Sequence, residues 1–267
     1  MFELSDREFT QFQRFIYEAA GITLASSKKP LVAGRLGKRV KERNFEGFGA
    51  YFKLLASGAE PAEVQTAVDL LTTNETYFFR EPKHFDLLRK TALESRPGPD
   101  TFRVWSAASS TGEEAYSIAM VLDDCRGGRP WDIVGSDISL RVLERARKGH
   151  YPEERTTRVP QSYLRRYCLR GTGAQAGTVL VERNLRKRVQ FLQINLNTTL
   201  PPRLGTFDVI FLRNVMIYFN GDTKRQVVGR VLATLKPGGY FFIGHSENLN
   251  GVSEAVTPTA PSIYRKG

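Results

Sequence analysis

The sequence predicts an α/β protein in which a doubly wound, mostly parallel sheet follows an N-terminal helical domain and contains a small antiparallel β-subdomain insertion. Helical periodicity fills the first 72 residues, and from about residue 100 short apolar strands alternate with amphipathic helices. Between the second and third strands, residues 151–190 are too long for an ordinary connection. We therefore expect a helical domain over 1–72, a linker over 73–99, and an α/β domain over 100–267 that includes the insertion.

The helical region begins with a helix that has clear end signals. Ser5 and Glu8 have the spacing of a capping box, and Gly21 suits a left-handed helix end. The apolar residues between them recur at helical intervals: Phe9, Phe12, Phe15, Ile16 and Ala19. A helix after Pro30 places four bases on one face, which we expect to be exposed: Arg35, Lys38, Arg39 and Arg43. Pro61 marks the start of a further helix that closes the region.

The α/β region is marked by five short apolar runs with the composition of buried strands: FRVWSA, DIVGSD, VQFLQI, FDVIFL and YFFIG. Helical patterns lie between or after them, as in EEAYSIAMVL, SLRVLERAR and TKRQVVGRVLATL. In the insertion, the run YCLRGTGAQAGTVLVER places a glycine-rich turn between β-prone segments, which predicts a small hairpin. Strands that alternate with helices favour parallel pairing, with helices on both faces of the sheet.

Positive charge is concentrated in two segments of the chain. The net charge is +11 over 267 residues. Residues 28–43 carry seven Lys/Arg and one acid, and residues 151–190 carry nine Lys/Arg and three acids, so each segment contributes +6 and the remaining chain −1. This distribution predicts two separate docking surfaces for anionic partners.

Cysteine, histidine and hydropathy patterns argue against several classes of protein. Cys125 and Cys168 lie far apart without metal-ligand spacing, and His84, His150 and His245 are scattered along the chain. We therefore expect neither a metal site nor a hydrolytic triad. The N-terminal residues lack the pattern of a secretory signal, and no apolar run approaches the ~18 residues of a membrane span. The expectation is a cytoplasmic protein without membrane insertion.

The loop after the first predicted strand has the position of a nucleotide-binding turn. It runs from Ala107 to Gly112 and contains small residues, which allow close approach of a ligand. Asp137, at the end of the next strand, is placed where an acid commonly binds both ribose hydroxyls. Glu113 and Glu114 stand at a helix start, where they would repel a pyrophosphate but suit a cofactor with a sulfonium and an ammonium group. S-adenosylmethionine therefore fits better than NAD, while an ordinary βα turn and a helix cap are the structural alternatives.

Five motifs carry a resemblance to a known family. They are TTNETYFFRE from Thr72, VWSAASSTGEE from Val104, FLRNVMIYF from Phe211, LKPGG from Leu235 and GHSEN from Gly244. In this order, and over nearly the whole chain, they closely resemble the chemotaxis receptor methyltransferase (CheR) family. The resemblance implies a Rossmann-like class I methyltransferase that uses S-adenosylmethionine, releases S-adenosylhomocysteine and esterifies glutamate side chains of methyl-accepting chemotaxis receptors.

The resemblance also implies roles for individual residues. The implied cofactor site comprises Asn74, Thr76, Arg80, Glu114, Asp137, Asn195, Leu196, Arg213 and Asn214. Glu114 and Asp137 would bind the amino-acid and ribose parts, and Asn195-Leu196 would lie by the adenine. Arg80 and Tyr218 are the expected catalytic residues. Taken singly, some have structural alternatives, such as an ion pair of Arg80 with Glu81 or a core position for Tyr218.

Methyl transfer to a carboxylate requires mainly that the protein position the reacting groups. A glutamate carboxylate has a reference pKa of about 4.3, so it is ionised at neutral pH and needs no general base. We expect alignment and exclusion of water to supply the catalysis. Arg80 or Arg213 would hold a carboxylate, because a guanidinium fork suits a planar acid, and the sequence leaves open which arginine does so.

Substrate docking is expected at the two basic segments. The bases of the second helix, Arg35, Lys38, Arg39 and Arg43, would meet acidic helices in the cytoplasmic domains of the receptors. By resemblance, the hairpin turn with Arg170, Gly171 and Gly173 would bind a C-terminal receptor peptide by strand addition.

Three other functions are less well supported by the sequence. A nucleic-acid methyltransferase would suit the positive charge, but the segment LRNVMIYF stands where base-modifying enzymes carry an Asn/Asp-Pro-Pro-aromatic motif. We therefore expect no nucleic-acid partner. A non-catalytic module that senses the cofactor is disfavoured by the intact set of site residues. An NAD-dependent dehydrogenase is disfavoured by the missing glycines of the nucleotide loop.

Overall fold

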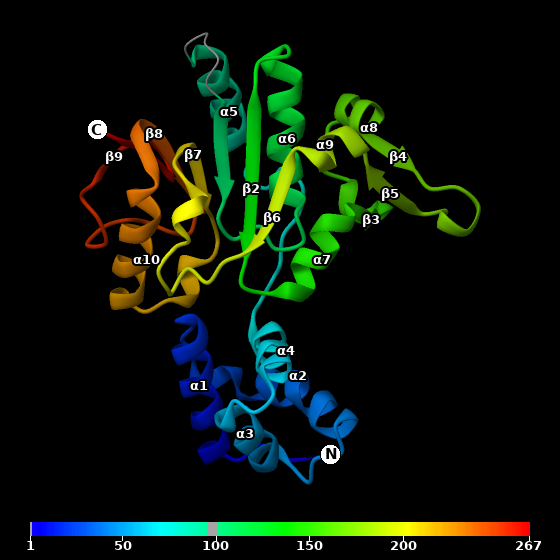
Figure 1. Ribbon diagram of the computed structural model, residues 1–267, viewed down its shortest axis with the longest axis vertical. Helices are drawn as coiled ribbons and strands as arrows, with labels where there is room; N and C mark the ends of the chain where they lie inside the picture. The colour runs from blue at the N-terminus through cyan, green and yellow to red at the C-terminus, as the bar shows by residue number, and fades with distance from the viewer. Residues whose placement is uncertain (1, 96–100) are drawn as a thin grey trace.

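The computed structural model describes residues 2–95 and 101–267. A helical domain lies at one end of the molecule and an α/β domain at the other, with a small β-subdomain projecting from the side (Figure 1). The helical domain comprises α1 (Asp6–Ala20), η1 (Ser26–Lys28), α2 (Lys29–Glu42), α3 (Phe48–Ser57) and α4 (Pro61–Leu71). These helices enclose an apolar core of their own, which includes Phe12, Ile16, Leu36 and Tyr51.

Helix α1 begins and ends as its sequence predicts. The Ser5 hydroxyl accepts from the Glu8 N–H, and the Glu8 carboxylate accepts from the Ser5 N–H at 2.9 Å. At the other end Gly21 has φ 72° and donates to the carbonyl of Tyr17 at 2.8 Å. Between them the apolar stripe faces the core, with Phe12 fully buried. The predicted capping box and glycine end are both confirmed.

The α/β domain is built on a sheet with the spatial strand order β6-β2-β1-β7-β8-β10-β9. Its strands are β1 (Phe102–Ser106), β2 (Trp131–Asp137), β6 (Val189–Gln193), β7 (Phe207–Leu212), β8 (Leu235–Ile243), β9 (Val256–Ala260) and β10 (Ile263–Lys266). The five predicted strands are present and run parallel to one another, whereas β10 runs antiparallel to both β8 and β9. The sequence did not predict β9 or β10. Strand β9 is mostly exposed and contains Pro258, a combination that suits an edge strand and lacks a core signal.

The order of the strands reverses between β1 and β7. From β1 the chain builds outward through β2 and β6, and from β7 it builds the other way through β8. Connections that leave two adjacent strands in opposite directions open a crevice at the carboxyl ends of those strands. That edge of the sheet faces the helical domain (Figure 1). The fold therefore predicts a ligand site between the two domains.

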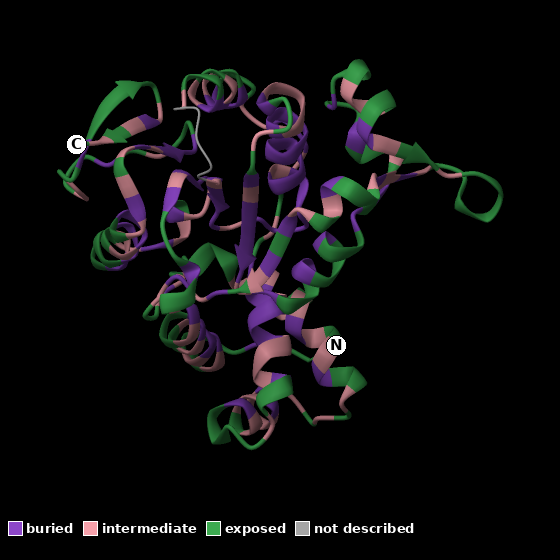
Figure 2. Cartoon of the chain, turned by 45° about the horizontal axis from the view of Figure 1, so that its top comes forward, coloured by how far each residue is buried: buried purple, intermediate pink, exposed green. Residues whose placement is uncertain are grey.

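Helices cover both faces of the sheet, as predicted. They are α5 (Lys83–Glu94), α6 (Glu113–Arg126), α7 (Leu140–Lys148) and α10 (Gly221–Ala233). Alternate residues of β7 enter different cores: Val209 and Phe211 pack with α5 and α6, whereas Ile210 and Leu212 pack with α10. Figure 2 shows the resulting burial along the central strands and the inner faces of the helices. None of the helices that the structure describes has both the length and the apolar character required to cross a bilayer.

The insertion forms a separate small sheet with the order β3-β5-β4. Its elements are β3 (His150–Pro152), η2 (Glu153–Thr156), α8 (Gln161–Tyr167), β4 (Cys168–Arg170), η3 (Gly173–Gln175), β5 (Thr178–Val181) and α9 (Arg183–Lys187). Strands β4 and β5 pair antiparallel, which confirms the predicted hairpin. The turn requires Gly171, because a Cβ there would lie 1.9 Å from the carbonyl oxygen of Gln175. Short helical turns flank β7: η4 (Pro202–Leu204) and η5 (Met216–Tyr218).

Candidate active site

A cleft opens at the carboxyl edge of the sheet, between the α/β domain and the helical domain. About 840 Å³ within it is not filled by protein atoms, a volume that includes space open to solvent. Every residue predicted to bind the cofactor or to act in catalysis lines it: Asn74, Thr76, Arg80, Glu114, Asp137, Asn195, Leu196, Arg213, Asn214 and Tyr218. The structure therefore brings the predicted set together, while the role of each member stays a prediction.

The loop from β1 to α6 lines one side of the cleft. Ser110 has φ 48°, its N–H donates to Asp137 Oδ2 at 3.0 Å, and its hydroxyl donates to the Asn74 carbonyl at 2.8 Å. Gly112 has φ 95°, and a Cβ there would lie 2.9 Å from the Cβ of Ala146. Only glycine fits that position, which explains why one glycine remains in a loop otherwise made of alanine, serine and threonine.

Asp137 ends β2 with its carboxylate held by backbone donors. Oδ2 accepts from Ser110 N–H and Oδ1 accepts from Ser139 N–H, each at 3.0 Å. Helix α7 is capped by Ser139, whose hydroxyl accepts from the Val142 N–H. Burial raises the pKa of Asp137 to about 6, although the two backbone donors oppose that rise. Each carboxylate oxygen keeps a further lone pair, so Asp137 can still accept from two ribose hydroxyls.

Arg213 joins two carboxylates at the back of the cleft. Its Nη1 lies 3.0 Å from Glu114 Oε2, its Nη2 lies 3.0 Å from Glu81 Oε2, and its side chain is only 1% exposed. Burial raises the pKa of Glu114, and Arg213 limits that rise. Burial also acts to raise the pKa of Glu81, but Arg213 and the N–H of His245 outweigh it, so that pKa is lowered. Two carboxylates share one guanidinium, which favours a cationic ligand at this wall.

Glu113 does not face the cleft, and the expectation that both acids at the start of α6 would meet the cofactor is wrong for it. Its side chain is fully buried, accepts from the Thr111 hydroxyl at 2.6 Å and pairs with Arg155. Successive side chains on a helix point about 100° apart, so Glu114 and Glu113 cannot both enter one cleft.

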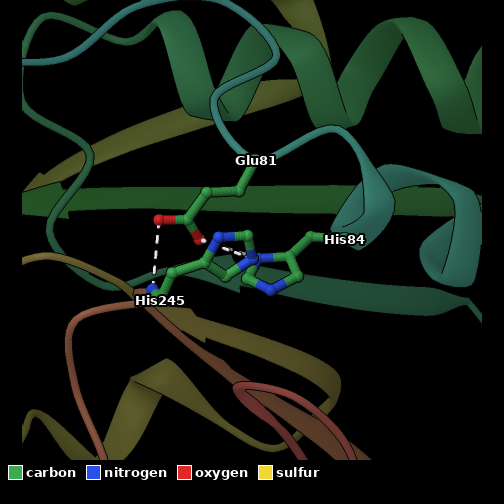
Figure 3. A group of neighbouring side chains, drawn as sticks. All are labelled: Glu81, His84 and His245. Atoms are coloured by element: carbon green, nitrogen blue, oxygen red, sulfur yellow. Dashed lines mark hydrogen bonds and ion pairs between the residues drawn. The ribbon is translucent and has the colours of Figure 1, made fainter.

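Glu81, His84 and His245 lie together beside Arg213, although they are far apart in the sequence (Figure 3). Glu81 Oε1 accepts from the backbone N–H of His245 at 3.1 Å. Glu81 Oε2 lies 3.4 Å from His84 Nδ1 and 3.8 Å from His245 Nε2. Burial, with Arg213 next in importance, lowers the pKa of His84 to about 3, so its ring is neutral at physiological pH.

The spacing of this cluster would suit a metal ion, since the three ligand atoms lie within 4.8 Å of one another. Arg213, however, lies 3.0 Å from the same Glu81 oxygen, so a cation there would meet a permanent positive charge. We interpret the cluster as the surroundings of the Glu81–Arg213 ion pair and assign it no metal. The histidines are scattered in the sequence, and the group forms only because α5 packs against the end of β8.

The turn after β7 places Asn214 at the cleft in a left-handed conformation, with φ 57°. Glu247 holds this turn, because its Oε2 accepts from the N–H of Asn214 at 2.8 Å and from the N–H of Gly244 at 2.7 Å. A Cβ at Gly244 would lie 2.4 Å from Asn214 Nδ2. The motifs FLRN and GHSEN therefore form one structural unit. Glu247 was missing from the predicted site, and its only signal was its place in a recognised motif.

The helical domain supplies part of the cleft wall. Ala20 and Ile22 line the cleft, and Ile22 forms an antiparallel bridge with Phe219. The Asn195 side-chain amide donates to the carbonyl of Ala19 at 2.7 Å and so ties the two domains together. Ala20 and Ile22 were absent from the predicted site, because apolar wall residues carry no chemical signature in the sequence.

Arg80 differs from Arg213 in having no acidic partner within the ranges that the structure describes. Its Nη1 donates to the carbonyl of Glu75 at 3.3 Å, and its Cζ lies 5.5 Å from the centre of the Tyr77 ring. The alternative of an ion pair with Glu81 is not realised, since Glu81 pairs with Arg213. A cleft-lining guanidinium thus stays available for an anionic ligand.

The basic face of α2 is largely occupied, which corrects the expectation that it is exposed. Arg39 Nε donates to Glu63 Oε1 at 2.8 Å, and Arg43 lies 3.3 Å from the same carboxylate. Arg35 donates to backbone carbonyls at the end of α4. Of the four bases, Lys38 alone is mostly exposed, at 83% of its side chain. Helical spacing showed which bases share a face but not that α4 packs its acids against them.

The hairpin residues of the second predicted docking surface lie outside the cleft. The Arg170 side chain is 77% exposed and lies 2.8 Å from Glu153. Gly171 and Gly173 stand in the turn that joins β4 to β5. The residues predicted to bind a receptor peptide are therefore separate in space from the cofactor site (Figure 1).

Comparisons with known proteins match two family models. "CheR methyltransferase, all-alpha domain" matches residues 7–72, and "CheR methyltransferase, SAM binding domain" matches residues 74–263. The chemotaxis protein methyltransferase of Escherichia coli (strain K12) is 43% identical over 263 residues, which cover 98% of this chain and 91% of that protein. Chemotaxis protein methyltransferase 2 of Pseudomonas aeruginosa is 43% identical over 265 residues, which cover 98% of this chain and 94% of that protein.

One solved structure shows a distant likeness. A SAM-dependent methyltransferase from Geobacter sulfurreducens in complex with S-adenosyl-L-homocysteine is 16% identical, with a TM-score of 0.37. The match covers 63% of this chain and 50% of that one.

Proposed function

The chain belongs to the CheR methyltransferase family and uses S-adenosylmethionine as methyl donor, and we propose that it transfers the methyl group to glutamate side chains of chemotaxis receptors. The products are glutamate methyl esters and S-adenosylhomocysteine. One observation carries the proposal: residues from the linker and from four strand ends meet in a single cleft that Arg80 also lines, and Arg80 has no acidic partner in residues 2–95 and 101–267. We further propose that the reaction takes place in the cytoplasm, on the signalling domains of the receptors.

The residues of the cleft fit S-adenosylmethionine by charge and by their donors and acceptors. Asp137 offers a carboxylate to the ribose hydroxyls, and Glu114 offers one to the ammonium group. Asn74 and Thr76 add polar groups from the linker, and Asn195-Leu196 offers apolar surface for the adenine. When bound, the cofactor supplies a methyl group on a sulfonium, which a carboxylate oxygen can attack.

We assign the two arginines different roles. Arg213 is occupied by Glu81 and Glu114, so it positions Glu114 and does not bind a further acid. Arg80 lines the cleft without an acidic partner in the described part of the chain, so it binds and orients the substrate carboxylate. That carboxylate is ionised at neutral pH, and the protein needs only to align it and to exclude water. Tyr218 lines the same cleft, and we propose that it contributes to excluding water.

The test combines binding and turnover. Isothermal titration of S-adenosylhomocysteine and of NAD into the purified protein should show binding of the former alone. Tritiated methyl transfer to receptor-containing membranes should then leave a label that is released by base, as a methyl ester is. Binding of NAD, or label on nucleic acid, would overturn the proposal.

We also propose that the β-subdomain binds a C-terminal receptor peptide. Strand β4 is an edge strand in the order β3-β5-β4, so its outer side offers backbone groups to an added strand. Its end bears Arg170, and Gly171 and Gly173 follow in the turn. Immobilised peptides from receptor C-termini should retain the protein, and an absence of retention by any of them would contradict this docking mode.

A further inference from the structure

Two guanidinium groups lie near the same aromatic ring at the edge of the cleft. Arg80 Cζ is 5.5 Å from the centre of the Tyr77 ring, and Arg158 Cζ is 4.6 Å from it. Both distances end at one ring centre, so the guanidinium carbons are separated by no more than their sum, about 10 Å. Tyr77 directly follows Thr76, which lines the cleft. The Arg158 guanidinium carbon therefore lies within about 10 Å of that of Arg80, although Arg158 does not itself line the cleft and is absent from the predicted site.

The charge of Arg158 is not neutralised by any acid in residues 2–95 or 101–267, and the same holds for Arg80. Two neighbouring arginines of the insertion are paired with acids. Arg155 pairs with Glu113, and Arg166 lies 2.9 Å from Asp124. Two unpaired like charges held close together repel each other, and a bound anion relieves that repulsion. An arginine that stacks on a ring also keeps its in-plane N–H donors free for a carboxylate.

Arg158 also lines a second groove, to which Phe79, the residue before Arg80, contributes. Its apolar residues include Phe79, Phe85 and Val121. It also contains Asp86, and Asp124 that pairs with Arg89. A polypeptide that places one acidic side chain at Arg80 therefore has both a second cation and apolar surface beside it. This combination fits an acidic, amphipathic protein segment better than a small molecule.

We propose that Arg158 forms a second carboxylate-binding subsite, which makes the enzyme prefer substrates with another acidic side chain close to the methylated glutamate. The inference rests on the proposed function, because both carboxylates belong to the substrate of the same cleft. On a helix, side chains four residues apart have their Cβ atoms about 5–6 Å apart. Two glutamates at that spacing have the reach to occupy Arg80 and Arg158 together.

The test pairs one substitution on the enzyme with one on the substrate. The enzymes are the wild type, Arg158→Gln and a matched control, Arg165→Gln, which removes an equally exposed charge from the same insertion. The substrate is a soluble receptor cytoplasmic fragment with a single methyl-accepting glutamate and either glutamate or glutamine four residues away. The wild type should favour the fragment with two glutamates by about three- to tenfold in kcat/KM, mainly through KM. Arg158→Gln should lose this preference and Arg165→Gln should keep it.

The outcomes separate the subsite from the function itself. If the wild type methylates both fragments equally well, or Arg158→Gln keeps the preference, the subsite is overturned and the methyltransferase function stands. If the wild type methylates neither these fragments nor receptor membranes, both proposals fail. S-adenosylhomocysteine affinity, measured by titration, should be equal in all three enzymes. A loss confined to Arg158→Gln would place that arginine at the cofactor and overturn the subsite.

Discussion

Two parts of the cleft use arginine in opposite ways. The inner wall consists of Glu81, Glu114 and Arg213. The mouth is the group formed by Arg80, which lines the cleft, with Tyr77 and Arg158 beside it. In the inner wall the guanidinium is buried and bound to two carboxylates, whereas the guanidinium groups of the mouth have no acidic partner in the part of the chain that the structure describes. An arginine that is already neutralised organises the site, while one that is not can bind an anion. The number of unengaged donors, rather than nearness to the cleft, therefore separates positioning residues from substrate-binding ones.

The strongest test of this difference is Arg213→Ala. The substitution leaves Glu81 and Glu114 buried without their shared cation, which should lower the free energy of unfolding by about 3–5 kcal/mol. Urea denaturation of the wild type and the variant measures the loss. The double variant Arg213→Ala with Glu114→Gln should recover part of it, because one of the unpaired charges is gone. A loss below about 1 kcal/mol in the single variant would show that the inner wall does not depend on the pairs.

Arg80→Ala, a substitution at the mouth, should lower activity rather than stability. Methyl transfer should fall by about a hundredfold, because the substrate carboxylate loses its partner, while the fold stays intact. Tritiated methyl transfer and thermal denaturation, measured side by side, check both halves. Arg80→Lys keeps the charge but not the fork, so it should recover only part of the activity. Near-normal turnover of Arg80→Ala would remove Arg80 from the proposed mechanism.

The sequence predicted which residues line the cleft, but it did not predict which ion pairs and hydrogen bonds those residues form. Motifs at strand ends identified Asp137, Arg213 and Asn214, because parallel strands deliver their carboxyl ends to one edge. The division of labour between Arg80 and Arg213 was not predictable, since it depends on which acid each one reaches. Contacts made by packing alone were missed as well, such as the approach of His245 to Glu81.

Asp137 is buried like the inner wall, and two backbone N–H groups bind its carboxylate. Burial raises its pKa from 3.8 to about 6. The folded chain therefore binds this proton more tightly than the unfolded chain does. The stabilisation by protonation is complete below the unfolded pKa and is lost as the pH rises through about 6. Measured against Asp137→Asn, the free energy of unfolding of the wild type should fall between pH 4 and pH 7.

Cofactor binding should show the opposite pH dependence, because the ionised form of Asp137 is the better acceptor for ribose hydroxyls. For a single group with a pKa of about 6, S-adenosylhomocysteine affinity should weaken by about tenfold between pH 7 and pH 5. Titrations at both values check this expectation. Asp137→Asn should bind weakly at either pH and lack the difference. If Asp137→Asn shows the same pH dependence of binding as the wild type, a group other than Asp137 causes that dependence.

The smallest expected effect comes from a free charge far from the cleft. Lys38 is unengaged, apart from a 3.8 Å approach to Glu42, whereas its helix neighbour Arg39 binds Glu63, whose side chain is 2% exposed. If α2 meets acidic receptor helices, Lys38→Gln should raise KM for the receptor by about twofold at low salt and leave stability unchanged. Arg39→Gln should instead lower the free energy of unfolding, because it leaves Glu63 without its main partner. If Lys38→Gln and Arg39→Gln change the free energy of unfolding but not KM, α2 has a structural role only. Substrate binding would then depend on the arginines of the mouth.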